Sequence, residues 1–335
     1  KVGHRVTVFE RDDRIGGLCM YGIPNMKLDK QIVQRRVDLL EAEGITFVTG
    51  ANVGVNVSVD QLREEYDAIL LACGALKGRE LDIPGRQLTG VHMAMPYLHG
   101  VTRSFLDSGF EDSQFIDTKG KHVIVIGGGD TGADCIGTAL RQGSASLINI
   151  TRRDREPEQR DAFHPWPGPP GSYFLDYSHV ESQARFGRDP RQYAVLPREF
   201  VDDGTGQVKA MKIERLRWTQ DAVGHWHRHE TGKIDELPAD LVFLSIGFSG
   251  PDTPTLIEQL GVKTDDGHVH AEYGQFQTNV RGVFVAGDMR RGASLIVWAI
   301  AEGRGAARCI DEYLTGHSNL PSPGMTLAEL PSSAG

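Results

Sequence analysis

Residues 122–132 read His-Val-Ile-Val-Ile-Gly-Gly-Gly-Asp-Thr-Gly. The apolar run Val123–Ile126 is typical of a strand buried on both faces of a parallel sheet. It leads directly into a G-x-G-x-x-G turn in which each glycine has a separate physical role. Gly127 permits a tight turn, Gly129 lets the backbone approach a pyrophosphate, and Gly132 lets the following helix pack close to the strand.

A G-x-G-x-x-G motif indicates a dinucleotide site only when a helix follows the turn. Ala133–Gln142 can continue as a helix that Gly143 ends. The N-terminus of that helix would offer unpaired N–H groups and a positive dipole end to a phosphate. The strand, turn and helix together predict a dinucleotide site formed by Gly127, Gly129, Asp130, Thr131 and Gly132.

The end of the next strand bears on which nucleotide is preferred. Ser146–Ile150 is followed by Arg152 and Arg153, at the place where a site selective for NAD usually carries an acidic residue. A guanidinium suits a ribose 2′-phosphate, so the pair favours NADPH over NADH. The alternative is a solvated basic strand end compensated by Asp154 and Glu156.

Composition excludes several other classes of protein. The chain has 335 residues, which is long enough for two domains, and its net charge of −9 argues against a nucleic-acid or anionic-membrane partner. Glycine contributes 40 residues, or about 12% against a usual level of about 7%, which is consistent with several nucleotide-binding turns. No signal peptide or long apolar run is visible, so we expect a soluble, cytoplasmic protein. The four cysteines lack C-x-x-C spacing, which argues against an internal iron–sulfur cluster.

A second nucleotide-binding unit is indicated at the start of the chain. His4–Glu10 reads as a strand with an acidic residue at its carboxyl end, where a ribose hydroxyl would be held. Gly16 and Gly17 follow in a polar loop that would let the backbone pass close to a ligand. The preceding strand and its glycine turn are expected upstream of Lys1, which makes the chain an N-terminally truncated polypeptide. The alternative is a true first strand with a chance glutamate.

Further strands and turns place the boundaries between the units. We expect a helix over Leu28–Glu43, strands over residues 45–48, 66–74, 240–247 and 278–288, and a helix from about residue 292 toward Tyr313. Linker composition places the first crossing between domains near residues 75–115. The expected division is 1–110 and 256–335 for one domain, with an inserted domain at 111–255. Asp288, just before the last helix, would hydrogen-bond the ribityl or pyrophosphate part of a flavin nucleotide, and the helix N-terminus would face the flavin ring.

Two features leave their role open. Residues 157–197 are rich in proline and aromatic residues and read as a long irregular loop, either capping a nucleotide site or contacting a partner, or simply decorating the surface. Residues 213–218 and 225–229 alternate like paired strands, which places three histidines on one face. Without cysteine or carboxylate companions at ligand spacing, we favour a solvated strand face over a metal site.

Taken together, these segments resemble flavoproteins of the pyridine nucleotide-disulfide reductase type, and among them the small (β) subunits of glutamate synthase. The resemblance spans nearly the whole chain. Its motifs are Glu10 with residues 14–24, which end in Tyr-Gly-Ile-Pro, Lys27-Leu28, Gly127–Gly132, Ala286–Asp288 and residues 292–300, which end in Trp-Ala-Ile.

The resemblance implies an α/β fold with two Rossmann-like domains, an FAD domain and an NAD(P)H domain inserted in it. The residues expected to bind FAD are Glu10, Gly17, Leu18, Val53, Gly74, Asp288 and Leu295. Further residues expected to bind a cofactor are Gly16, Gly247, Gly287 and Ser294. Those expected to bind NADPH or NADH are residues 127–132, Arg152 and Arg153. The proline-rich loop resembles that of members that use NADH. It therefore favours NADH, whereas Arg152 and Arg153 favour NADPH.

The resemblance also implies an electron route. Hydride passes from NAD(P)H to FAD, and electrons leave through iron–sulfur clusters to a large (α) subunit that makes glutamate from glutamine and 2-oxoglutarate. Ligands for those clusters are expected only in the region upstream of Lys1. Direct hydride transfer requires no protein acid or base, so we nominate no catalytic residue. The alternatives are an electron-input module of another reductase, such as a dihydropyrimidine-dehydrogenase-like or ferredoxin:NADP-type protein, and a non-catalytic nucleotide-binding scaffold.

Overall fold

The computed structural model describes residues 2–160, 173–221 and 225–321. The chain divides into two compact units, each discontinuous in sequence. Unit 1 contains residues 1–15, 34–79 and 247–335, and unit 2 contains residues 16–33 and 80–246. The expected domain boundaries at residues 110 and 255 stay a prediction. In this division, residues 80–110 supply a strand and a helix to unit 2.

Unit 2 is built on a five-stranded sheet in which all neighbouring strands are parallel. The runs of apolar residues in its middle strands explain their burial, and in β6 every residue after His122 is buried. The sheet has the strand order β5 (Val91–Met93), β12 (Leu241–Leu244), β6 (His122–Ile126), β7 (Ser146–Ile150) and β8 (Arg191–Gln192).

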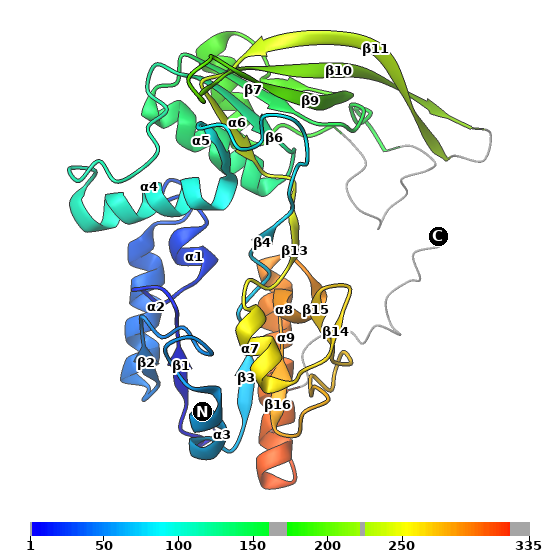
Figure 1. The fold of residues 1–335 in the computed structure, drawn as a ribbon. Coiled ribbons are helices and arrows are strands. Elements are labelled where there is room, and N and C mark those ends of the chain that lie inside the picture. Colours follow the sequence, from blue (N-terminus) through cyan, green and yellow to red (C-terminus); the bar gives the residue numbers. More distant parts are fainter. Residues whose placement is uncertain (1, 161–172, 222–224, 322–335) are drawn as a thin grey trace. The chain divides into compact units, whose positions relative to one another are not determined.

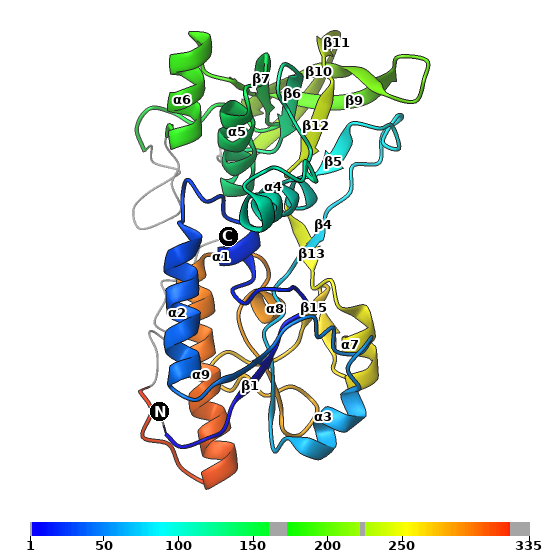
Figure 2. The same ribbon diagram turned by 90° about the vertical axis from the view of Figure 1, so that its left-hand side faces the viewer.

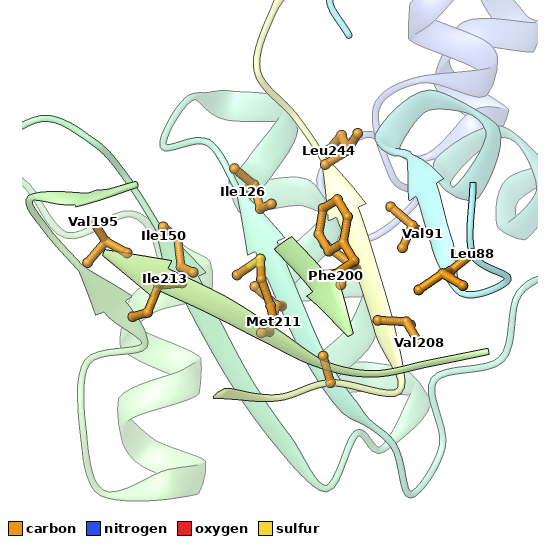
Figure 3. Packing of buried hydrophobic residues seen from close by; sticks show 13 residues of the cluster. Leu88, Val91, Ile126, Ile150, Val195, Phe200, Val208, Met211, Ile213 and Leu244 are labelled. Atoms are coloured by element: carbon orange, nitrogen blue, oxygen red, sulfur yellow. The ribbon is translucent and has the colours of Figure 1, made fainter. Parts of the chain in front are cut away.

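Helices cover one face of this sheet and a second sheet covers the other (Figure 1). The helices are α4 (Ala94–Ser108), α5 (Asp130–Gln142) and α6 (Tyr177–Phe186), and the short α1 (Leu18–Tyr21) belongs to the same unit. The second sheet is antiparallel, with β10 (Val208–Gln220) between β9 (Val195–Asp202) and β11 (Trp226–Pro238). Figure 3 shows the core between the two sheets, where Phe200, Met211 and Ile213 pack near Ile126, Ile150 and Leu244.

Unit 1 contains short parallel strand pairs flanked by helices (Figures 1 and 2). β1 (Thr7–Phe9) pairs with β2 (Thr46–Val48), and β3 (Ile69–Leu71) pairs with β16 (Val283–Val285). Two antiparallel pairs join β4 (Lys77–Gly78) to β13 (Phe248–Gly250) and β14 (Thr264–Asp265) to β15 (His268–Val269). The helices are α3 (Val59–Glu65), α7 (Pro254–Leu260), α8 (Asp288–Arg291) and α9 (Ile296–Thr315), while α2 (Lys30–Ala42) spans the boundary between units.

Most of the predicted elements are present. The expected helix at 28–43 is α2, the helix after the glycine turn is α5, and Gly143 ends α5 in the left-handed conformation. The predicted pairing of residues 213–218 with 225–229 is confirmed, with Leu216 opposite Glu230 and Gln220 opposite Trp226. The α/β class is confirmed.

The division between the units after residue 79 lies within the range 75–115, where the first crossing was expected. Beyond this point, β5 joins the central sheet and α4 packs on it through Tyr97 and Leu98. The prediction of a long irregular loop over residues 157–197 was wrong in part. The range 157–197 contains α6 and β8, and α6 begins at a capping box in which Asp176 and His179 each bind the other's backbone N–H. The Pro/Trp-rich part of that prediction, residues 161–172, lies outside the described residues. Among the helices in the described ranges, none is long and apolar enough to cross a membrane.

Candidate functional site

The turn after β6 excludes side chains at two of its glycines. Gly127 has φ +118°, and a Cβ there would lie 2.1 Å from the carbonyl oxygen of Ser245. A Cβ on Gly132 would lie 2.6 Å from the carbonyl oxygen of Gly127 and 3.0 Å from the Ser245 hydroxyl. Because real Cβ contacts of this length with backbone atoms do not occur, only glycine allows α5 to start this close to the end of β6.

The middle of the same turn is open. A Cβ on Gly129 would have no heavy atom within 4 Å, and Gly129 is the residue before the first residue of α5, Asp130. No side chain caps this helix end, so the N–H groups of Asp130, Thr131 and Gly132 have neither an intrahelical nor a capping partner in the described residues, while that of Ala133 donates to the carbonyl of Gly129 (3.1 Å). A phosphate group fits this arrangement, because its oxygens accept from such N–H groups and are favoured by the positive end of the helix dipole.

A buried amide supports the turn from the neighbouring strand. Asn149 of β7 is 1% exposed, and its Nδ2 donates to the carbonyl oxygens of Val125 (3.0 Å) and Gly127 (2.7 Å). Its Oδ1 is buried without a hydrogen-bond partner in the described residues. Our reading of the sequence missed this residue, although a lone polar side chain within the apolar strand 146–150 was the available signal.

Arg152 and Arg153 are exposed just beyond β7, with their backbone held in place. The indole N–H of Trp218 donates to the carbonyl of Arg152 (2.9 Å), and the N–H of Ala194 donates to the carbonyl of Arg153 (2.8 Å). Within the described ranges neither guanidinium forms an ion pair, so compensation by Asp154 and Glu156 is not seen. Both side chains are free to reach an anionic group.

In unit 1, Glu10 stands at the carboxyl end of β1 as expected. Its backbone continues the pairing with β2, donating to the carbonyl of Val48 (2.9 Å), and its carboxylate accepts the N–H of Asp12 (2.9 Å). Partial burial raises the pKa of Glu10, and the hydrogen bond from Asp12 offsets part of that rise. The carboxylate is half-buried, with accepting capacity left for a hydroxyl donor.

Other expected residues of unit 1 lie at strand ends and turns. Gly74 (φ +73°) follows β3 with open space at its Cβ position, and Val53 packs against the core around Leu71. Gly247 (φ +91°) precedes β13, where its carbonyl accepts the N–H of Arg79 (2.9 Å). These residues lie at turns and strand ends of the backbone. Among the described contacts, none joins them to Glu10.

The segment 286–296 forms the turn predicted near the last helix. Gly287 (φ +68°) precedes α8, and the Asp288 carboxylate accepts the N–H (3.3 Å) and hydroxyl (3.4 Å) of Ser294. Burial raises the pKa of Asp288, and the two bonds from Ser294 work against that rise. Leu295 precedes the first residue of α9, and its side chain is 59% exposed. An exposed apolar residue beside a half-buried carboxylate suits a ligand with an apolar ring and a polar tail.

Gly16, Gly17 and Leu18 fall in unit 2. A Cβ on Gly16 (φ +131°) would lie 2.9 Å from Val33 Cγ1, and Gly17 precedes the first residue of α1. Lys30 supports this segment from α2. It is 3% exposed, and its Nζ donates to the carbonyls of Cys19 (2.9 Å) and Ile23 (2.5 Å). Burial lowers the pKa of Lys30 to about 8. Sequence reasoning missed this role, because nothing in the sequence shows that a lysine is buried.

The histidines of the β10–β11 hairpin bind neighbours on their own sheet. His227 lies 3.0 Å from Asp221, and His229 lies 2.7 Å from the hydroxyl of Thr219. All three histidine side chains are exposed. In the parts of the chain that the structure covers, no three His, Cys, Asp or Glu residues are grouped so as to hold a metal ion.

Comparison with known proteins gives one family and several relatives that this chain resembles. The model of the family described as pyridine nucleotide-disulphide oxidoreductase matches residues 1–303. The chain is 50% identical over 322 residues to the glutamate synthase (NADPH) small chain of Bacillus subtilis, which covers 96% of this chain and 65% of that protein. It is 44% identical over 327 residues to the glutamate synthase (NADH) of Schizosaccharomyces pombe, covering 97% of this chain and 16% of that protein. This chain thus spans less than two thirds of the length of each of these two relatives.

The fold is also shared with a solved structure. Mycobacterium tuberculosis FprA in complex with NADPH superposes with a TM-score of 0.70 at 21% identity, covering 93% of this chain and 78% of that one. This likeness concerns the fold alone, with its two dinucleotide-binding domains. Because the family model matches residues 1–303, which is most of the sequence, the chain belongs to the pyridine nucleotide-disulphide oxidoreductase family.

Proposed function

We propose that this chain is the electron-input flavoprotein part of a glutamate synthase, and that it binds FAD and oxidises NADPH. The observation that carries the proposal is the 50% identity to a glutamate synthase (NADPH) small chain over 96% of the sequence. The open turn at Gly129, at the uncapped N-terminus of α5, supports it independently, because it is suited to a pyrophosphate.

The residues of the chain act by binding and orienting. In unit 2, the turn at 127–132 would hold the pyrophosphate of the nicotinamide nucleotide. FAD would be held in unit 1 by Glu10, Val53, Gly74, Gly287, Asp288, Ser294 and Leu295. Gly16, Gly17, Leu18 and Gly247 remain expected cofactor-binding residues. When bound, FAD supplies a flavin ring that accepts hydride directly from a nicotinamide. Because that transfer needs no protein acid or base, orientation and exclusion of water are the contributions left to the chain.

NADPH is the proposed donor because Arg152 and Arg153 are free at the end of β7. A guanidinium binds a phosphate through charge-assisted bonds, whereas the ribose hydroxyl of NADH gives it only a neutral partner. The Bacillus subtilis relative is named for NADPH and the Schizosaccharomyces pombe relative for NADH, so both donors occur among similar proteins.

We further propose that the electrons pass through iron–sulfur clusters held outside this chain to a large subunit. There, glutamine and 2-oxoglutarate would be converted to glutamate. These substrates are ordinary cytoplasmic metabolites, and we place the complex in the cytoplasm. The relatives named as small chains support a large partner subunit.

The test uses the full-length protein that contains this chain, loaded with FAD and titrated without oxygen. We expect NADPH to bleach the visible absorbance of the bound flavin, with NADH less effective. Absence of bleaching by both nucleotides would refute the oxidoreductase role and favour a scaffold. The large subunit is then added with glutamine and 2-oxoglutarate. Bleaching without glutamate formation would point to the electron-input module of another reductase, and glutamate formed without the large subunit would refute the division of labour.

A further inference from the structure

A fully buried carboxylate lies beneath the turn that carries Asp288. Glu302, in the second turn of α9, is 0% exposed. Its Oε2 accepts the backbone N–H of Gly287 (2.9 Å) and the Nε of Arg290 (2.9 Å). Its Oε1 accepts Nη2 of Arg290 (2.5 Å) and Nη1 of Arg291 (3.2 Å). We call these four groups the Glu302 cluster: the Glu302 carboxylate, the Gly287 N–H and the two guanidinium groups.

The Glu302 cluster binds both ends of α8. Gly287 precedes the first residue of that helix, and Arg290 and Arg291 are its last two residues. A helix of four residues is far too short to be stable alone, so its position depends on what it is attached to. Glu302 attaches it to α9, a helix of 20 residues. Met289 also packs in the core, and the Arg291 guanidinium lies over the Trp298 ring of α9. Among these contacts, the Glu302 carboxylate is the group that binds the backbone N–H directly before Asp288.

The bonds that hold Asp288 itself are weaker. Its carboxylate accepts from Ser294 at 3.3 and 3.4 Å, which is at the long end of the range for hydrogen bonds. The Glu302 contacts are shorter, involve charged partners and are buried, and such bonds are about twice as strong as neutral ones. The peptide unit that precedes Asp288 is thus held more firmly by Glu302 than the Asp288 side chain is held by its own loop.

We infer that Glu302 is a positioning residue for the FAD site, acting through the Gly287 N–H to fix the place of the Asp288 carboxylate. The inference rests on the proposed function, because it takes FAD as the ligand of Asp288. Glu302 is fully buried and so does not itself offer a surface to a ligand. Its effect is on the ribityl or pyrophosphate contact that Asp288 would make, and Gly129 and Arg152 of unit 2 take no part in it.

A charge-removing substitution that keeps the size of the side chain tests this role. Glu302→Gln retains one oxygen for the Gly287 N–H but presents the arginines with a neutral amide. Glu312→Gln is the matched control, because Glu312 lies on the same helix and forms a partly exposed pair with Arg308 at 2.8 Å. FAD affinity is measured on the apoprotein by quenching of FAD fluorescence, NADPH affinity by calorimetry, and folding by thermal denaturation.

We expect Glu302→Gln to weaken FAD binding by roughly tenfold or more, which corresponds to about 1.4 kcal/mol per factor of ten. NADPH affinity should stay within about twofold, and Glu312→Gln should leave both affinities unchanged. A loss of both affinities together would show a general structural role and overturn the inference, as would an unchanged FAD affinity. Failure of the unsubstituted protein to bind FAD would instead refute the proposed function.

A second variant keeps the test decisive if Glu302→Gln does not fold. Arg290→Lys preserves the positive charge beside Glu302 but lacks the fork of two donors that reaches both carboxylate oxygens. We expect a loss of FAD affinity of about threefold to tenfold with NADPH affinity unchanged. FAD affinity equal to that of the unsubstituted protein would overturn the positioning role.

Discussion

Gly129→Ala should separate the binding of a nucleotide from the stability of the fold. The backbone of Gly129 has φ −90°, which alanine adopts without strain, and a Cβ there meets no heavy atom within 4 Å. We therefore expect the free energy of unfolding to change by no more than about 0.5 kcal/mol. The added methyl group would, however, occupy the space through which a pyrophosphate approaches the N–H groups of α5.

The expected cost in binding follows from the bonds that the methyl group would block. A hydrogen bond to a charged group contributes about 1.5–3 kcal/mol, so losing one from the pyrophosphate weakens binding by roughly 10- to 150-fold. NADPH affinity is measured by calorimetry on the oxidised protein, and KM and kcat by anaerobic flavin reduction. KM should rise with little change in kcat, because the pyrophosphate is held equally before and during transfer.

Gly132→Ala is the companion variant, because the structure predicts a different outcome three residues away. Alanine would gain about 1 kcal/mol of helix propensity. Its Cβ would however lie 2.6 Å from the carbonyl oxygen of Gly127, and overpacking of this kind costs about 1–3 kcal/mol. We expect the clash to prevail, with a net loss of stability as well as affinity. If Gly129→Ala binds NADPH as tightly as the unsubstituted protein, the turn does not contact the pyrophosphate and the reasoning fails.

Three further variants test other parts of the chain. Arg152→Ala should raise the Kd for NADPH by about tenfold and leave that for NADH unchanged, and equal losses for both would exclude a phosphate-reading role. Burial lowers the pKa of His179 from 6.5 to about 4, so protonation favours the unfolded chain and stability falls as pH drops from 6.5 to 4, by up to roughly 3 kcal/mol. His179→Asn should remove that part of the pH dependence in urea unfolding, and identical pH profiles for the two proteins would contradict it. Lys30→Met should lower the free energy of unfolding by roughly 2–5 kcal/mol, because it leaves the partly buried carbonyls of Cys19 and Ile23 without their Nζ donor. Arg36→Met, on the exposed side of α2, should change it by less than about 0.5 kcal/mol, and similar values for both variants would argue against the buried role of Lys30.

The elements that could be predicted from sequence are those in which one local rule decides the structure. β6 follows from four consecutive apolar residues, and the helix after it follows from the glycine turn and from Gly143. The β10–β11 pairing follows from alternation on both strands. In each case, the residues that form the sequence pattern are also the residues whose conformation or packing forms the element.

The elements that could not be predicted depend on long-range contacts. β5 is three residues long, and it is a strand because it pairs with β12, about 150 residues later in the sequence. α4 follows the stretch of linker composition over residues 74–90, and its Tyr97 is fully buried against Phe243, with ring centroids 4.0 Å apart. Composition indicates local flexibility, and it does not show packing between residues far apart in the sequence.

The residues that hold the two candidate sites in place could not be predicted from the sequence either, because they also act through contacts with a different element. Asn149 donates to the carbonyl of Gly127 from the strand that follows α5, and Glu302 accepts the N–H of Gly287 from the helix that follows α8. In both turns, a glycine has a backbone conformation that its own neighbours do not stabilise, and a buried polar side chain from the next element binds the free backbone group. Neither residue belongs to a glycine motif, and neither is exposed to a ligand. A motif therefore predicts where a nucleotide would bind, while the geometry of that candidate site depends on buried residues that the structure alone reveals.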